Sequence, residues 1–151
     1  MGKTLLGLAL LPLFTFAQTN SHQVKPAQQE TPPSISITPD HLDFADQVVK
    51  RASKPQRLTV TNTGGKKLYI NSVALSGDDQ QDFTVARDTC TGATIDAQKS
   101  CVVDVIFAPT TNEKRKSSLI FTDNALNSPQ TVQLSGNGIN SADVPPRKSG
   151  R

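Results

Sequence analysis

The chain has 151 residues, which is room for one domain with tails, and a net charge of +3. It contains no Trp and a single Tyr, so it lacks the interleaved aromatic and basic side chains of nucleic-acid-binding domains. The pair Lys66-Lys67 and the run Lys114-Arg115-Lys116 are therefore interpreted as solvated positions that discourage pairing between sheet edges. Composition and charge together exclude nucleic acid as the expected partner.

Residues 1–17 are typical of a secretory signal peptide. Lys3 precedes an uncharged segment from Leu5 to Ala17, and Thr15-Phe16-Ala17 places small residues at the cleavage positions. A transmembrane helix needs about 20 apolar residues, and Pro12 interrupts this segment. We therefore expect an exported protein without a transmembrane anchor, in the periplasm, at the cell surface or outside the cell.

Two polar segments flank the expected domain. Residues 18–33 are rich in Gln and Pro, and residues 140–151 are polar with three cations near the end. Neither segment has enough apolar side chains to offset the entropy of ordering its chain. The sequence therefore predicts a disordered linker over 18–33, a compact domain over 34–139 and a disordered tail over 140–151.

The compact block shows alternating apolar residues, which is the pattern of half-buried strands. Gly64 and Gly65 are expected to turn the chain, and a change of phase at Asn71-Ser72 indicates a β-bulge. Strands are predicted over residues 42–44, 57–62, 68–75, 83–85, 101–107, 119–121 and 132–134. Seven short strands without a helical pattern between them predict a seven-stranded antiparallel immunoglobulin-like β-sandwich. Its expected core is aliphatic with Phe44, Phe83, Phe107 and Phe121.

The acidic and histidine residues do not match a metal-binding motif. Asp78, Asp79 and Asp82 lack the spacing and the closing Glu of a calcium loop, so we interpret them as a solvated turn. His22 lies in the predicted linker and His41 at the first strand, which is not the spacing of a zinc site. No metal and no cofactor are expected.

Nucleophilic catalysis also has no supporting pattern. The segment Ser135-Gly136-Asn137-Gly138 is interpreted as a turn, since it lacks the G-x-S-x-G elbow and a following helix. His41 could act as a general base only with a partner that the sequence does not identify. We expect no catalytic residue and no enzyme activity.

Five segments occur in an order that resembles a known family. They are PDHLDF (39–44), LTVTNTGGKKLYI (58–70), SGDDQQDFTV (76–85), CTGATIDAQKSCVVDVIFAPT (90–110) and SLIFTDNALNSPQTVQLSGNG (118–138). The block resembles the ASH (abnormal spindle, hydin)-like immunoglobulin-type domains, which are related to the major-sperm-protein (MSP) fold. The exported bacterial version, found in choice-of-anchor D proteins, is the most similar. This resemblance implies a structural or protein-interaction module, not an enzyme.

Cys90 and Cys101 could in principle be metal ligands, a redox pair or a disulfide. Ten residues separate them, which is neither the C-x-x-C spacing of a redox pair nor that of a zinc site. An exported chain with an even number of cysteines favours bonding. The sequence therefore predicts a Cys90–Cys101 disulfide, whose loop closure contributes about 3 kcal/mol.

The function expected from the sequence is binding or scaffolding through surface loops or a sheet edge. Addition of a strand to an open edge binds an extended segment through backbone hydrogen bonds. The partner would be a protein or an envelope component that the sequence does not name. The alternative is a carbohydrate-binding module of the cell envelope, for which Tyr69 is the available aromatic platform.

Overall fold

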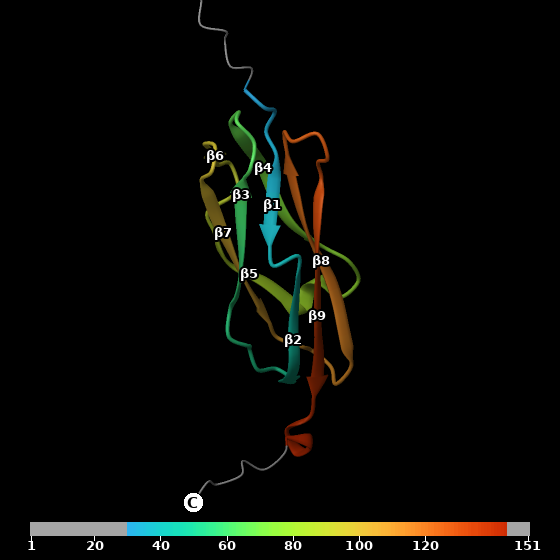
Figure 1. Cartoon of the computed structure of the whole chain (residues 1–151). Helices are drawn as coiled ribbons and strands as arrows, with labels where there is room; N and C mark the ends of the chain where they lie inside the picture. Colours follow the sequence, from blue (N-terminus) through green and yellow to red (C-terminus); the bar gives the residue numbers. More distant parts are fainter. Residues whose placement is uncertain (1–29, 145–151) are drawn as a thin grey trace, which may run out of the picture.

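The computed structural model describes residues 30–144. The predicted signal peptide (1–17), residues 18–29 of the predicted linker and residues 145–151 of the predicted tail lie outside this range. Among the described residues, no helix is long and apolar enough to cross a membrane. Strands and two short 3-10 helices make up the regular structure of this range (Figure 1): β1 (Ile35–Thr38), β2 (His41–Val48), β3 (Gln56–Asn62), β4 (Leu68–Ser76), η1 (Gln80–Asp82), β5 (Phe83–Asp88), β6 (Thr94–Ile95), β7 (Ser100–Phe107), β8 (Lys114–Asp123), β9 (Gln130–Ile139) and η2 (Ser141–Asp143).

The strands form two sheets that pack face to face. Sheet I has the order β1-β3-β7-β5, and sheet II has the order β2-β9-β8-β4-β6. Every second residue of β3, β7, β8 and β9 is buried, so one face of each sheet meets the core and the other meets solvent. The predicted all-β sandwich with alternating strands is confirmed.

The prediction of seven antiparallel strands is wrong in two respects: residues 30–144 form nine strands, and β2 pairs with β9 in parallel. The short β1 precedes Pro39, and β6 has only two residues, so neither gives a clear alternating pattern. No hairpin joins β1 to β2. The chain passes from sheet I to sheet II near Pro39 and keeps its direction, which is also the direction of β9 (Figure 1).

Three glycines of the domain, Gly64, Gly136 and Gly138, lie where an added Cβ would overlap neighbouring atoms. Gly64 lies against the Pro32 carbonyl, where an added Cβ would overlap the backbone. Gly136 and Gly138 lie inside β9 and not in the turn that we predicted after Leu134. An added Cβ at Gly136 would overlap the Phe107 ring, so this position accommodates a large side chain from the opposite sheet.

The predicted phenylalanine core is confirmed, since Phe44, Phe83, Phe107 and Phe121 are all buried. Phe107 lies 4.9 Å from Phe83 and 5.7 Å from Phe44 between ring centroids. These rings come from β7, β5 and β2, so the cluster joins the two sheets at one end of the sandwich. The predicted bulge is confirmed as well, because the register of β4 with β8 shifts between Ile70 and Ser72.

Replacing Gly136 with Ala should destabilise the domain by about 1–3 kcal/mol, because the added methyl group overpacks the Phe107 ring. Urea denaturation measures this loss, with Ser135→Ala on the solvent side of the same strand as the control. A loss below about 0.5 kcal/mol, the range of ordinary surface substitutions, would contradict the contact between β9 and Phe107.

Candidate interaction surfaces

Cys90 and Cys101 form the predicted disulfide. Their Cα atoms are 5.2 Å apart, and both residues are buried. Asp88 closes the turn before Cys90, since its carboxylate accepts hydrogen bonds from the backbone N–H of Cys90 and Thr91. Burial raises the pKa of Asp88, but hydrogen bonds from Thr91 and Cys90 outweigh this and lower it overall. The bond is typical of proteins that fold in an oxidising compartment.

The residues between the two cysteines, 91–100, form a loop that we call the stapled loop. It leaves sheet I after β5, pairs with sheet II through β6, and returns to sheet I as β7. The N–H of Gly92 donates to the Ile70 carbonyl at 2.8 Å, and the N–H of Ile70 donates to the Ala93 carbonyl at 3.0 Å. The disulfide therefore closes the base of a loop that links the two sheets.

Asn62 is a buried polar residue that the sequence interpretation did not identify. It is 0% exposed, and its side-chain amide donates to the carbonyls of Lys66 and Ile95 at 2.8 and 2.9 Å. Its side-chain oxygen accepts the N–H of Gly64 at 3.0 Å. Asn62 thus fixes the Gly64 turn against the stapled loop, and its inward place in the alternation of β3 is the sequence signal that could have revealed it.

The acidic loop is not the solvated turn that we predicted, because Asp82 is buried and paired with Arg115. Arg115 Nε lies 2.6 Å from Asp82 Oδ2, and Arg115 Nη1 lies 2.9 Å from Asp79 Oδ1. The other carboxylate oxygen of Asp82 accepts the N–H of Thr110 at 3.2 Å. This network, the Arg115 clamp, attaches the start of β8 to η1. Arg115 is in phase with the buried positions of β8, and that phase distinguishes it from its lysine neighbours.

The His, Cys, Asp and Glu side chains of the described residues do not gather into a metal site. Within residues 30–144, no three His, Cys, Asp or Glu side chains lie together in a group that could hold a metal ion. His41 is exposed and bonds its neighbour Asp40 at 2.8 Å, and this bond and the charge of His41 lower the pKa of Asp40. Ser135 lies on the outer face of β9, in a shallow groove of sheet II.

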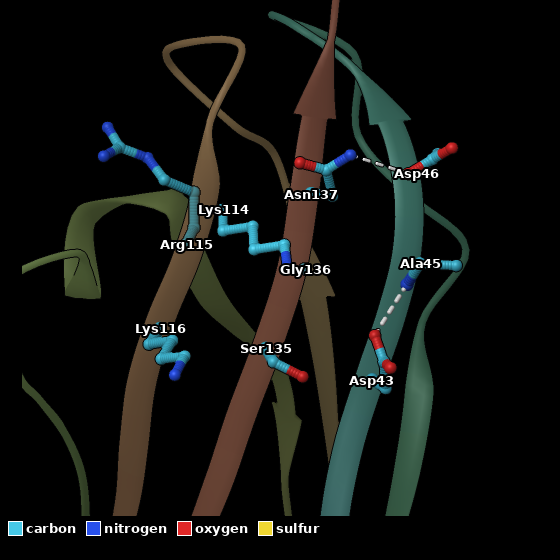
Figure 2. Close-up of a pocket in the computed structure, with 9 residues that line it drawn as sticks. All are labelled: Asp43, Ala45, Asp46, Lys114, Arg115, Lys116, Ser135, Gly136 and Asn137. Atoms are coloured by element: carbon cyan, nitrogen blue, oxygen red, sulfur yellow. Dashed lines mark hydrogen bonds between the residues drawn. The ribbon is translucent and has the colours of Figure 1, made fainter.

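That groove has a volume of about 400 Å³ and runs across β2, β9 and β8 (Figure 2). We call it the polar groove. Asp43 and Asp46 line it on β2, Ser135 and Asn137 form its floor on β9, and Lys114 and Lys116 line it on β8 (Figure 2). The side chain of Arg115 points away from the groove, toward the clamp described above.

A second depression surrounds the exposed Tyr69 at the end of the domain where the described chain begins. Its volume is about 450 Å³, and Lys66, Lys67, Asp96 and Asn124 contribute to its lining. Most of these polar groups already have partners: Lys67 bonds Asp96 at 2.8 Å, and Asn124 accepts the N–H of Tyr69 at 2.8 Å. Tyr69 itself is 45% exposed.

Removing the charge of Asp82 should weaken the fold more than removing a charge from the same loop at the surface. We expect Asp82→Asn to lower the free energy of unfolding by about 2–3 kcal/mol, because Arg115 would lose its buried charged partner and keep only the more exposed carboxylates of Asp79 and, at 3.8 Å, Glu113. Asp78→Asn, at an exposed position, should stay within about 0.5 kcal/mol of the wild type. Equal effects of both variants in chemical denaturation would disprove the clamp.

Comparison with known proteins agrees with this architecture. A search of curated proteins gives no significant match. Among solved structures, a protein of unknown function from Porphyromonas gingivalis W83 shares 12% identity at a TM-score of 0.57, over 70% of this chain and 46% of the other. The ASH/PapD-like domain 7 of human CEP192 shares 17% identity at a TM-score of 0.53, over 83% of this chain and 99% of that domain.

The Escherichia coli chaperone DraB shares 12% identity at a TM-score of 0.50, over 69% of this chain and 54% of the chaperone. At these identities the likeness shows the fold alone, and it confirms the resemblance to ASH domains seen in the sequence. This chain spans less than half of the Porphyromonas protein and nearly all of the CEP192 domain. A family profile described as HYDIN/CFA65/VesB-like, Ig-like domain matches residues 33–137. The chain belongs to this family of immunoglobulin-like domains.

Proposed function

We propose that this protein is an exported, non-catalytic interaction module that binds an extended segment of a partner protein along β5. The family consists of immunoglobulin-like domains, a fold class used widely for binding. The disulfide and the predicted signal peptide support export. The observation that carries the proposal is the open margin of β5.

The other sheet margins offer less backbone to a partner. On β2, the side chain of Gln56 donates to the Asp43 carbonyl at 2.7 Å, and the Asp43 carboxylate accepts the N–H of Ala45. β1 has four residues and is followed by Pro39, and β6 has two. Side chains or short length therefore limit strand addition at all three.

The part of β4 that does not pair with β6 also has few backbone groups free for an added strand. The stapled loop occupies the N–H and carbonyl of Ile70, and the Ser117 hydroxyl donates to the Ser76 carbonyl at 2.9 Å. The stretch between these two residues is shorter than β5. β4 is therefore the weaker candidate for strand addition on this side of the sandwich.

β5 is the last strand of sheet I and has six residues. Within residues 30–144, the backbone of Thr84–Asp88 forms hydrogen bonds only in its ladder with β7. The register skips Ala86, which has no partner in β7. A bulge of this kind limits the length of a paired strand, so the edge suits a short segment. Val85 is half-buried at this margin, where an apolar side chain of the incoming strand would pack.

A carbohydrate ligand at Tyr69 is the alternative. The exposed ring and its depression of about 450 Å³ support it, whereas the partnered state of Lys67, Asp96 and Asn124 leaves few polar groups to orient a sugar. A glycan array with wild type and Tyr69→Ala separates the two functions: saturable binding that Tyr69→Ala abolishes would replace the protein-interaction proposal.

Blocking the β5 edge should abolish partner binding without unfolding the domain. Ala86→Pro removes an N–H and places a ring in the path of an added strand, but it breaks no pair with β7 because Ala86 has none. The partner captured from the exported fraction by the wild type should be lost with Ala86→Pro and kept with Ala52→Pro, which lies in an exposed loop distant in sequence from β5.

Thermal melts of both variants establish that they are folded. Capture that persists at wild-type level with a folded Ala86→Pro protein would rule out the β5 edge as the binding surface.

A further inference from the structure

The outer face of sheet II carries opposite charges in two columns. The register aligns Lys116 of β8 with Ser135 of β9 and Asp43 of β2 in one row, and Lys114 with Asn137 and Asp46 in the next. Each row therefore reads cation, neutral polar residue, anion across the polar groove (Figure 2). The two rows repeat the same order of charge.

The lysines and aspartates of one copy do not neutralise each other. Neighbouring strands lie about 4.8 Å apart, so β8 and β2 are separated by about 10 Å across β9. Within residues 30–144, neither Lys114 nor Lys116 forms an ion pair, and neither do Asp43 and Asp46. Asp46 accepts a hydrogen bond from Asn137 at 2.8 Å, and one oxygen of Asp43 accepts the N–H of Ala45. Each carboxylate keeps a second oxygen for a cation.

We infer that this face binds a second copy of the same chain, with a two-fold axis parallel to β9. A rotation of 180° about such an axis lays β2 of one copy over β8 of the other and leaves the rows in register. Asp43 of one copy then faces Lys116 of the other, and Asp46 faces Lys114. The same patch supplies both halves of the interface, as a two-fold contact requires.

The lengths of the side chains match in the same way as their charges. The side chains of Lys114 and Lys116 are longer than those of Asp43 and Asp46. In the dimer, the side of the groove with the longer side chains in one copy therefore meets the side with the shorter side chains in the other copy. The floor residues Ser135 and Asn137 lie near the axis, where short polar side chains allow the two sheets to approach. Charge and shape are therefore both self-complementary, which a groove lined by a single sign of charge would not be.

This interface is electrostatic and exposed at its rim, so its strength depends on salt. Pairs of this kind are screened by ions at distances near the Debye length. We expect a reversible dimer that forms at low ionic strength and weakens as salt is added. The surface is separate from the β5 edge, which lies in sheet I. A test of the dimer is therefore independent of a test of the proposed function.

Sedimentation equilibrium of the protein purified from the exported fraction tests the dimer. The dissociation constant should rise at least about tenfold between about 20 mM and about 500 mM NaCl. A protein that remains monomeric at low salt up to millimolar concentration would overturn the inference, and so would a dimer that salt does not weaken. Monomers that bind a small anion or a foreign protein at this face would overturn it as well.

Charge exchange identifies the face. The double variants Lys114→Glu/Lys116→Glu and Asp43→Lys/Asp46→Lys should each be monomeric, because every facing pair becomes repulsive. Mixing the two variants should restore a one-to-one heterodimer, since in the proposed pairing each new glutamate faces an introduced lysine of the other chain and each original aspartate faces an original lysine. A mixture that stays monomeric although both variants are folded would contradict the two-fold arrangement.

A matched control reverses charge elsewhere. Lys54→Glu/Lys66→Glu changes two exposed lysines outside the groove and should dimerise as the wild type does. If a charge-reversed variant fails to fold, Lys114→Gln/Lys116→Gln removes the charge while keeping most of the side-chain length. This neutral variant should raise the dissociation constant at least about tenfold at low salt, and an unchanged constant would refute the inference.

Discussion

Phe107 packs beneath Gly136, and the arrangement of the two sheets depends on this contact. The ring is fully buried, meets Phe44 and Phe83, and occupies the space that a side chain at position 136 would need. β9 can therefore lie close over the core between β2 and β8. The same placement puts Ser135 and Asn137 on the opposite, solvent-facing side, as the floor of the polar groove. β9 therefore determines both the packing against Phe107 in the core and the position of the floor of the polar groove on the surface.

Polar groups and the disulfide secure the loops and short elements that join the strands. Asn62 and the disulfide hold the stapled loop between the sheets, and the Arg115 clamp attaches β8 to η1. Each of these buried polar groups has several partners, which is the condition under which burial is tolerated. These contacts leave two surfaces available for binding. The edge of β5 has open backbone groups, and the outer face of sheet II carries the unpaired charges of the polar groove.

Sequence patterns predicted the features that depend on local alternation. Phe44, Phe83, Phe107 and Phe121 face inward as expected, and the phase change at Asn71-Ser72 marks a real bulge. Features set by pairing between distant segments could not be read in this way. The parallel pairing of β2 with β9 needs the chain path at Pro39, and the burial of Asp82 needs Arg115 from another strand. The charge rows of the polar groove likewise exist only through the register of β2, β9 and β8.

Hydrogen–deuterium exchange with and without the captured partner tests the proposed binding along β5 most directly. The amides of Thr84–Asp88 that face away from β7 should exchange quickly in the unbound protein, because no described group covers that margin. Partner binding should slow their exchange, while amides around Tyr69 should keep the unbound rate. Protection confined to the Tyr69 end, with no change along β5, would contradict the account.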